Sequence, residues 1–170
     1  MTASPACDSR WVLLQADIAD AVENLADGAA LYREELPEPS TRASLRRREK
    51  AFQKFLQDGY SSVERALIRV LELFDGTPPQ GRSWHSDLLR LAVAWQAPAG
   101  ASGPVRPPFA PALLADLRLL LQFRHVAMHG YSEFDLSLAR PAAEAAARVA
   151  AALPAAAEEF GRAAGLLPPA

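Results

Sequence analysis

Apolar residues recur along this chain at steps of three and four, in long stretches broken by clusters of proline and glycine. That spacing gathers them on one face of an α-helix. Alanine and leucine are abundant and β-branched residues are scarce, which also favours helix. No run with the two-residue alternation of a strand stands out. The pattern predicts an all-α fold.

Five helices are expected, separated by LPEPST, by DGTPP, by a proline-rich loop at residues 96–111 and by a short connection after Gly130. The first has Asp8 as its cap, and the second starts after Ser40 or Thr41. The expected helices cover Ser9–Glu35, residues 41–74, Ser83–Trp95, Pro111–His129 and Ser137–Ala164. We therefore predict an up-down bundle of about five helices, one domain over 8–164, with flexible termini at 1–7 and 165–170.

Each helix should bury one apolar face. In the first helix the expected stripe is Val12, Leu13, Ile18, Val22, Leu25, Ala29 and Leu31. In the second it is Leu45, Phe52, Phe55, Leu56, Val63, Leu67, Val70, Leu71 and Phe74. Tyr60, Trp84 and Trp95 are interpreted as packing residues. In the last helix, Pro141 suits the first turn, whereas Pro154 is expected to kink or interrupt the helix.

The composition excludes several classes of protein. The chain has 170 residues, half of them hydrophobic, which suffices for one sizeable core. Cys7 is the only cysteine, so an intrachain disulfide and a cysteine-based zinc site are excluded. The first residues lack the pattern of a signal peptide, and no apolar run approaches the roughly 18 residues of a membrane span. We expect a soluble, cytoplasmic protein without a membrane partner.

The net charge of −2 does not indicate a nucleic-acid binder, but the charges are unevenly placed. Residues 8–38 hold eight acidic and two basic residues, and the next sixteen hold six basic residues and one acidic one. The basic residues of this stripe are Arg42, Arg46, Arg47, Arg48, Lys50 and Lys54. They could follow an RNA backbone, form a solvated helix face, or pair with the acidic first helix.

The stretch FRHVAMHGY, residues 123–131, gathers polar chemistry at the expected end of the fourth helix. Arg124 or His129 there could simply favour the negative end of the helix dipole. His125 and His129, four residues apart, could also share a metal, but a zinc site needs at least three protein ligands. The remaining options are His85, on another helix, and scattered carboxylates. The sequence therefore predicts no metal site.

Arg124 and His129 also suit phosphodiester chemistry. Arginine offers a fork of donors to phosphate oxygens, and histidine exchanges protons near neutral pH. Five positions on an ideal helix place the two side chains about 140° apart. Either the helix unwinds next to Gly130, or the site is completed by a second subunit, which predicts a homodimer.

From Arg124 to Tyr131 the chain resembles the R-x4-H-x-Y motif of HEPN-domain toxins of the HepT type, with His125 where asparagine is more usual. The resemblance implies the HEPN fold and a homodimeric endoribonuclease that needs neither metal nor cofactor. It implies that Arg124 and His129 are catalytic and that His125 supports them. RNA is the implied substrate, and DNA is not expected.

The resemblance further implies a type VII-like toxin–antitoxin pair. The expected partner is a minimal nucleotidyltransferase antitoxin of the MntA type, which would silence the nuclease by transferring AMP from ATP to Tyr131. A non-catalytic HEPN module that binds nucleotide or scaffolds a nucleotidyltransferase is the alternative. A helix end that only builds a dimer interface is a third possibility.

Overall fold

The computed structural model of the chain describes residues 9–35, 40–94, 110–129 and 136–167. Within these ranges every regular element is helical, which confirms the all-α prediction. The elements are α1 (Ser9–Arg33), α2 (Arg42–Leu73), α3 (Trp84–Ala94), α4 (Pro111–His129), η2 (Leu136–Ala139) and α5 (Arg140–Ala163). None of the helices in these ranges combines the length and the hydrophobicity needed to cross a membrane.

The helix ends follow the local signals of the sequence. Thr41 caps α2, and its side-chain oxygen accepts a hydrogen bond of 3.1 Å from the backbone N–H of Ser44. Phe74 ends the same helix, and Pro111 is the first residue of α4. The predicted cap Asp8 and the predicted stop Gly130 lie outside the described residues.

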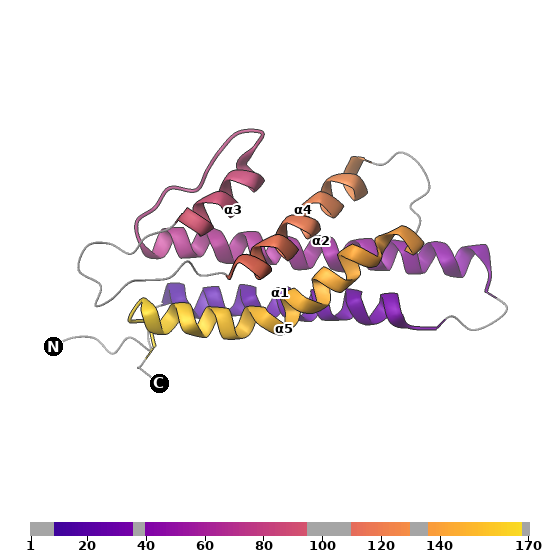
Figure 1. Ribbon diagram of the computed structural model, residues 1–170, viewed down its shortest axis with the longest axis horizontal. Helices are drawn as coiled ribbons and strands as arrows, with labels where there is room; N and C mark the ends of the chain where they lie inside the picture. Colours follow the sequence, from indigo (N-terminus) through magenta and orange to yellow (C-terminus); the bar gives the residue numbers. More distant parts are fainter. Residues whose placement is uncertain (1–8, 36–39, 95–109, 130–135, 168–170) are drawn as a thin grey trace.

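Three long helices, α1, α2 and α5, extend along the length of the molecule, and the shorter α3 and α4 lie against them at an angle (Figure 1). α1 packs against α2 and α5, while α4 packs against α5 and α2. The core between them consists mainly of leucine and alanine with a few aromatic rings, among them Phe52 and Tyr60. Tyr60 is thus a packing residue, as predicted; Trp84 is half-buried against the core, and Trp95 lies outside the described residues.

The buried face of α1 differs from the predicted stripe. Val12 and Leu13 are 54% and 47% exposed, so their assignment to the core was wrong. The helix is turned so that Trp11 and Leu14 point inward instead. The reason is the partner: Trp11 packs against Gly161 near the end of α5, where a residue with a side chain would not fit. Leu45, near the start of α2, is likewise exposed rather than buried.

A kink or an interruption was predicted at Pro154; α5 continues through this residue, so the interruption does not occur. Proline removes one backbone donor from the helix, but Leu153 and Phe160 on either side of it are buried in the core and hold both halves in place. The ribbon of α5 bends part-way along its length (Figure 1). Pro141 lies in the first turn, as predicted, and the short helix η2 leads into that turn.

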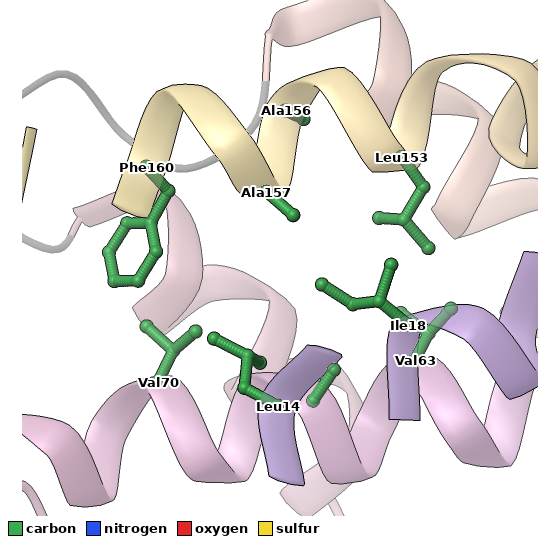
Figure 2. Close-up of a pocket in the computed structure, with 9 residues that line it drawn as sticks. Leu14, Ile18, Val63, Val70, Leu153, Ala156, Ala157 and Phe160 are labelled. Carbon is green, nitrogen blue, oxygen red and sulfur yellow. The ribbon is translucent and has the colours of Figure 1, made fainter. Parts of the chain in front are cut away.

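A small cavity of about 20 Å³ lies between α1, α2 and α5, beside the turn that follows Pro154 (Figure 2). Its walls are apolar side chains, including Leu14, Val63 and Phe160. A water molecule in such a space would lack the polar partners it needs. The cavity is therefore a gap in packing and too small for a substrate.

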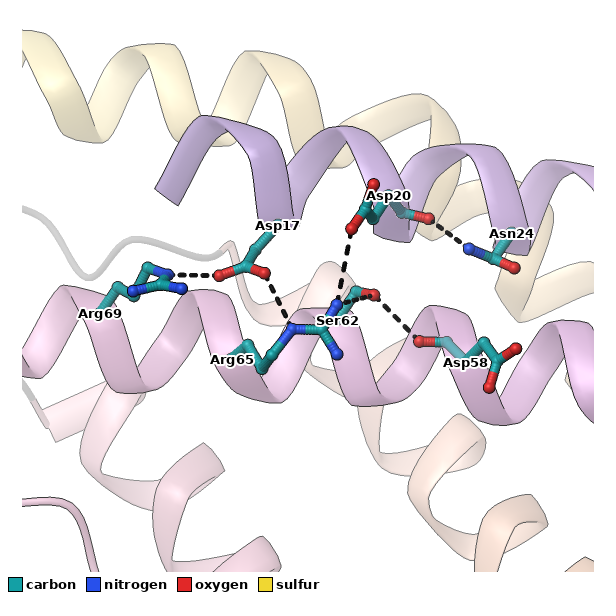
Figure 3. Close-up of polar contacts among 7 residues, drawn as sticks. All are labelled: Asp17, Asp20, Asn24, Asp58, Ser62, Arg65 and Arg69. Carbon is teal, nitrogen blue, oxygen red and sulfur yellow. Dashed lines mark hydrogen bonds and ion pairs between the residues drawn. The ribbon is translucent and has the colours of Figure 1, made fainter. Parts of the chain in front are cut away.

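The acidic helix α1 is tied to α2 by one buried carboxylate. Asp17 accepts hydrogen bonds from Nε of Arg65 at 2.8 Å and from Nε of Arg69 at 2.5 Å (Figure 3). Asp20, which lies 3.6 Å from Arg65, adds a more exposed ion pair. These pairs involve the second half of α2 and not the basic stripe at its start.

Two glycines let α1 and α2 approach closely. A Cβ atom built on Gly59 would lie 2.7 Å from Cγ of Leu25 and 3.2 Å from the backbone nitrogen of the same residue. A Cβ atom on Gly28 would lie 2.5 Å from the terminal Cδ1 of Leu56 and 3.2 Å from Cβ of Phe55. At Gly59 the clash involves a branch point and backbone, which cannot move aside. At Gly28 the closest atom is the flexible end of a side chain.

We expect Gly59→Ala to lower the free energy of unfolding by about 1 kcal/mol or more, because the cost of overpacking exceeds the gain in helix propensity. Gly28→Ala is the matched control and should cost less, since Leu56 can change rotamer. Urea unfolding of both variants measures the difference. Equal stability of the two variants would contradict this account of the helix contact.

Candidate functional site

The centre of the candidate site is the carboxylate of Glu64, on α2, whose side chain is only 5% exposed. It faces the last turns of α4 and the start of α3. Oε2 accepts a 2.5 Å hydrogen bond from Nη1 of Arg124, whose side chain is 16% exposed. Oε1 lies 2.5 Å from Nδ1 of His85, whose side chain is 18% exposed. Three helices thus each contribute one charged or titratable side chain.

The geometry fixes the tautomer of His85. Its Nδ1 lies 3.2 Å from Nη1 of Arg124 as well as 2.5 Å from Glu64. An unprotonated Nδ1 could accept from Arg124 but would set its lone pair against the carboxylate oxygen 2.5 Å away, whereas a protonated Nδ1 donates to that oxygen. The N–H of Nδ1 therefore points to Glu64, and the close approach to Arg124 is not a second hydrogen bond.

Aromatic rings enclose the three polar groups. The ring of Trp84 lies over His85 with 3.7 Å between centroids, and His125 meets His85 edge to face at 6.1 Å. The guanidinium of Arg124 lies 6.0 Å from the centroid of the buried Tyr60 ring. His125 is exposed. The cluster therefore has an apolar floor and reaches solvent on the side of His125.

Burial raises the pKa of the Tyr60 phenol well above its ordinary value, the nearby Glu64 raises it further, and Arg124 partly opposes both. The hydroxyl is buried and has no hydrogen-bond partner in the part of the chain that the structure describes. A buried, unpaired hydroxyl costs about 1–3 kcal/mol. The phenol of Tyr60 thus stays neutral, and its hydroxyl lacks a hydrogen bond within the described part of the chain.

Tyr60→Phe should therefore raise the free energy of unfolding by roughly 1 kcal/mol at neutral pH. The advantage of the variant should grow above pH 10, because tyrosine in the unfolded chain then ionises while the folded protein keeps it neutral. Thermal unfolding at pH 7 and at alkaline pH tests both parts. A less stable variant would indicate a hydrogen bond to the hydroxyl from outside the described ranges.

Two of the predicted site residues can be placed in full, and two cannot. Arg124 and His125 lie in the last turns of α4, with the surroundings just given. His129 is the final residue of α4, but its side chain lies outside the described residues, as does Tyr131. The pairing of Arg124 with His129 stays a prediction, and so does the absence of a metal shared by His125 and His129.

The basic stripe divides into different roles. Arg48 donates through Nη2 to backbone carbonyls at the end of α1, those of Leu31 at 2.6 Å, Tyr32 at 3.1 Å and Glu34. These bonds satisfy the last carbonyls of that helix, so Arg48 has a structural role. Lys54 pairs with Asp58 one turn further along α2. The other four basic residues of the stripe are exposed: Arg42, Arg46, Arg47 and Lys50.

No group of three or more histidine, cysteine, aspartate or glutamate side chains is placed to hold a metal ion, as far as the described ranges extend. Glu64 and His85 form only a pair, and the third member of the cluster is a cation. The chemistry that the described cluster offers is proton exchange beside a fixed positive charge.

The model of a family described as HepT-like protein matches residues 51–164, well over half of the chain. The chain belongs to this family. No curated protein and no solved structure matches it. The matched segment contains the whole Glu64 cluster of this HepT-like protein and excludes α1 and every basic residue of the stripe except Lys54. The sequence resemblance to HepT-type proteins is thereby confirmed.

The centre of the site was not predicted from the sequence. His85 was considered only as a possible third metal ligand, and Glu64 was not among the candidate site residues. A signal was nevertheless present: Glu64 follows Val63 and precedes Leu67, so it falls on or beside the face of α2 that is otherwise apolar. A carboxylate on a buried face is stable only when a cation is paired with it, so such a position indicates a buried ion pair.

Breaking the pair between Glu64 and Arg124 should be costly, because Arg124 alone would be a largely buried charge and Glu64 would keep only its contact with His85. We expect Arg124→Met and Glu64→Leu each to lower the stability of the HepT-like protein by about 3–5 kcal/mol. The double variant should be more stable than Arg124→Met alone, since it buries no charge. Denaturant unfolding measures this double-mutant cycle, and a purely additive loss would refute the coupling.

The exposed pair of Lys54 and Asp58 on the same helix supplies the control for this cycle. Lys54→Ala should change the free energy of unfolding by less than about 1 kcal/mol, because solvent screens an exposed ion pair.

Proposed function

We propose that the chain is the toxin of a toxin–antitoxin pair, a metal-independent endoribonuclease that acts as a homodimer. The single observation that carries the proposal is the placement of Arg124: a buried carboxylate holds its guanidinium at the end of α4 in a HepT-like protein. A cation fixed before substrate arrives loses little freedom on binding a phosphate, so it can stabilise charge that develops during the reaction.

The proposed reaction cleaves RNA without an external cofactor. Arg124 would bind the scissile phosphate and stabilise the negative charge that builds on its oxygens. His129, five residues further along, would exchange a proton with the 2′-hydroxyl or with the leaving 5′-oxygen. His125, exposed beside Arg124, would help to orient the phosphate. The products would be a 2′,3′-cyclic phosphate and a free 5′-hydroxyl.

Arg124 donates to Glu64 through Nη1, and within the described ranges its contacts to Glu64 and His85 use that nitrogen alone. A guanidinium has two further donor nitrogens. A phosphate could approach along them while Glu64 keeps its hydrogen bond, which supports substrate binding without loss of the buried ion pair. Arg42, Arg46, Arg47 and Lys50 are exposed and are proposed to contact the RNA backbone further away. Arg48 is left out because its guanidinium binds the carbonyls at the end of α1, and Lys54 because it pairs with Asp58.

Regulation is part of the proposal. A minimal nucleotidyltransferase partner would transfer AMP to Tyr131, two residues after His129. The added phosphate would place negative charge where the phosphate of the substrate has to bind. A cytoplasmic location remains a prediction.

A second candidate function is favoured by the low exposure of Arg124. A guanidinium that is 16% exposed and bonded to a buried carboxylate could serve the fold alone. The chain would then be a non-catalytic HEPN module that binds nucleotide or scaffolds a nucleotidyltransferase. The two candidates differ in one measurable property, RNA cleavage.

The test is cleavage of RNA in EDTA by the purified protein, after intact mass has shown Tyr131 to be unmodified. We expect cleavage by the parent, and a loss of at least about 100-fold in His129→Ala and in Arg124→Lys. Lysine at 124 keeps a positive charge beside Glu64 but loses the fork, so it avoids the instability expected of an apolar replacement. Arg118→Lys, an exposed arginine on the same helix, is the control and should remain active.

An unmodified, folded parent that leaves RNA intact would favour the non-catalytic module. Tyr131→Phe separates regulation from catalysis: it should cleave RNA as the parent does, and its mass should not change when the nucleotidyltransferase partner and ATP are added.

A further inference from the structure

The proposed function uses Arg124 and His129 but leaves the contact of Glu64 with His85 unexplained. We propose that His85 is a further catalytic residue, the general base that removes the proton from the RNA 2′-hydroxyl, with Glu64 holding its ring. This inference rests on the proposed ribonuclease function and assigns one step of it. Cleavage of RNA by this route needs a base for the 2′-hydroxyl and an acid for the 5′-oxygen, and two histidines can divide these tasks.

The first support is orientation. The N–H of Nδ1 of His85 points to Oε1 of Glu64, at 2.5 Å, so in the neutral ring Nε2 carries the lone pair. A carboxylate on one ring nitrogen fixes the tautomer and leaves the other nitrogen able to accept a proton. Once the ring is protonated, the same carboxylate stabilises it, as in enzymes that pair histidine with an acidic residue.

The second support is the charge balance of the cluster. Glu64 and Arg124 together are neutral, and His85 is mostly buried beside them. The charged and titratable groups that contact His85 in the described part of the chain are Glu64 from α2 and Arg124 and His125 from α4. Nδ1 of His85 lies 2.5 Å from Oε1 of Glu64 and 3.2 Å from Nη1 of Arg124, so the ring is held against both members of one ion pair.

The third support is position. Nδ1 of His85 lies 3.2 Å from Nη1 of Arg124, so a phosphate bound to Arg124 would bring the RNA backbone to the cluster that holds His85. Both side chains keep part of their surface exposed, and the ring of the exposed His125 lies 6.1 Å from that of His85.

In the proposed step, Nε2 of His85 takes the proton of the 2′-hydroxyl as the 2′-oxygen forms a bond to phosphorus. The bond between phosphorus and the 5′-oxygen breaks, and His129, in its protonated form, gives its proton to that oxygen. The step yields a 2′,3′-cyclic phosphate and a 5′-hydroxyl. His85 then returns its proton to water, and no oxidant, reductant or metal takes part.

The experiment compares the full-length parent, His85→Asn, His85→Ala and the control Ser86→Ala, an exposed residue of α3. Asparagine can keep the hydrogen bond to Glu64 but cannot take a proton, so fold and function are separated. We expect His85→Asn to unfold near the temperature of the parent and to cleave RNA at least about 100-fold more slowly. The rise of kcat/KM with pH on the acidic side should disappear, while Ser86→Ala keeps the profile of the parent.

Added imidazole should restore part of the activity of His85→Ala, in proportion to the concentration of its neutral form. A parent that cleaves RNA and depends on His129, together with a fully active His85→Asn, would overturn this inference and leave the proposed function standing. So would a slow variant with an unchanged pH profile and no response to imidazole, because that result assigns His85 a structural role. A parent without ribonuclease activity would remove both proposals at once.

Discussion

A carboxylate buried to the extent of Glu64 has to be neutralised where it lies, and that requirement governs the arrangement around it. Arg124 is held on α4 and His85 on α3, so one charge on α2 sets how the two shorter helices sit against the long ones. The leucine core could accept these helices in several orientations, because apolar contacts have little directionality. The ion pair allows only a few of these orientations, because hydrogen bonds need defined distances and angles.

The same interaction explains why Arg124 cannot be judged from its position in the chain. At the end of a helix an arginine usually projects into solvent and contributes only weakly. Here it is folded back over the Tyr60 ring and against Glu64, sixty residues earlier in the sequence. A group held in this way is already arranged for a phosphate, but its removal also damages the fold. Structural and catalytic roles of Arg124 are thus linked by one contact.

Local patterns in the sequence were sufficient to predict the helices. The cap at Thr41, the start at Pro111 and the extent of α2 follow from short-range chemistry. What failed depends on partners far along the chain: Val12 and Leu13 are exposed because Trp11 is matched to Gly161. Pro154 stays helical because its neighbours are buried, and Arg48 reaches back to α1. For the site, the R-x4-H spacing located Arg124, but no spacing rule joins residues 64, 85 and 124.

The packing of Trp11 against Gly161 and Phe160 also has a consequence for how the chain folds. It joins residues about 150 positions apart, and contacts between such distant segments form slowly because a large loop has to close first. During synthesis α1 leaves the ribosome long before α5 exists, and its apolar side chains have no partner on that helix until then. The contacts between α1 and α5 can therefore form only after α5 has been translated.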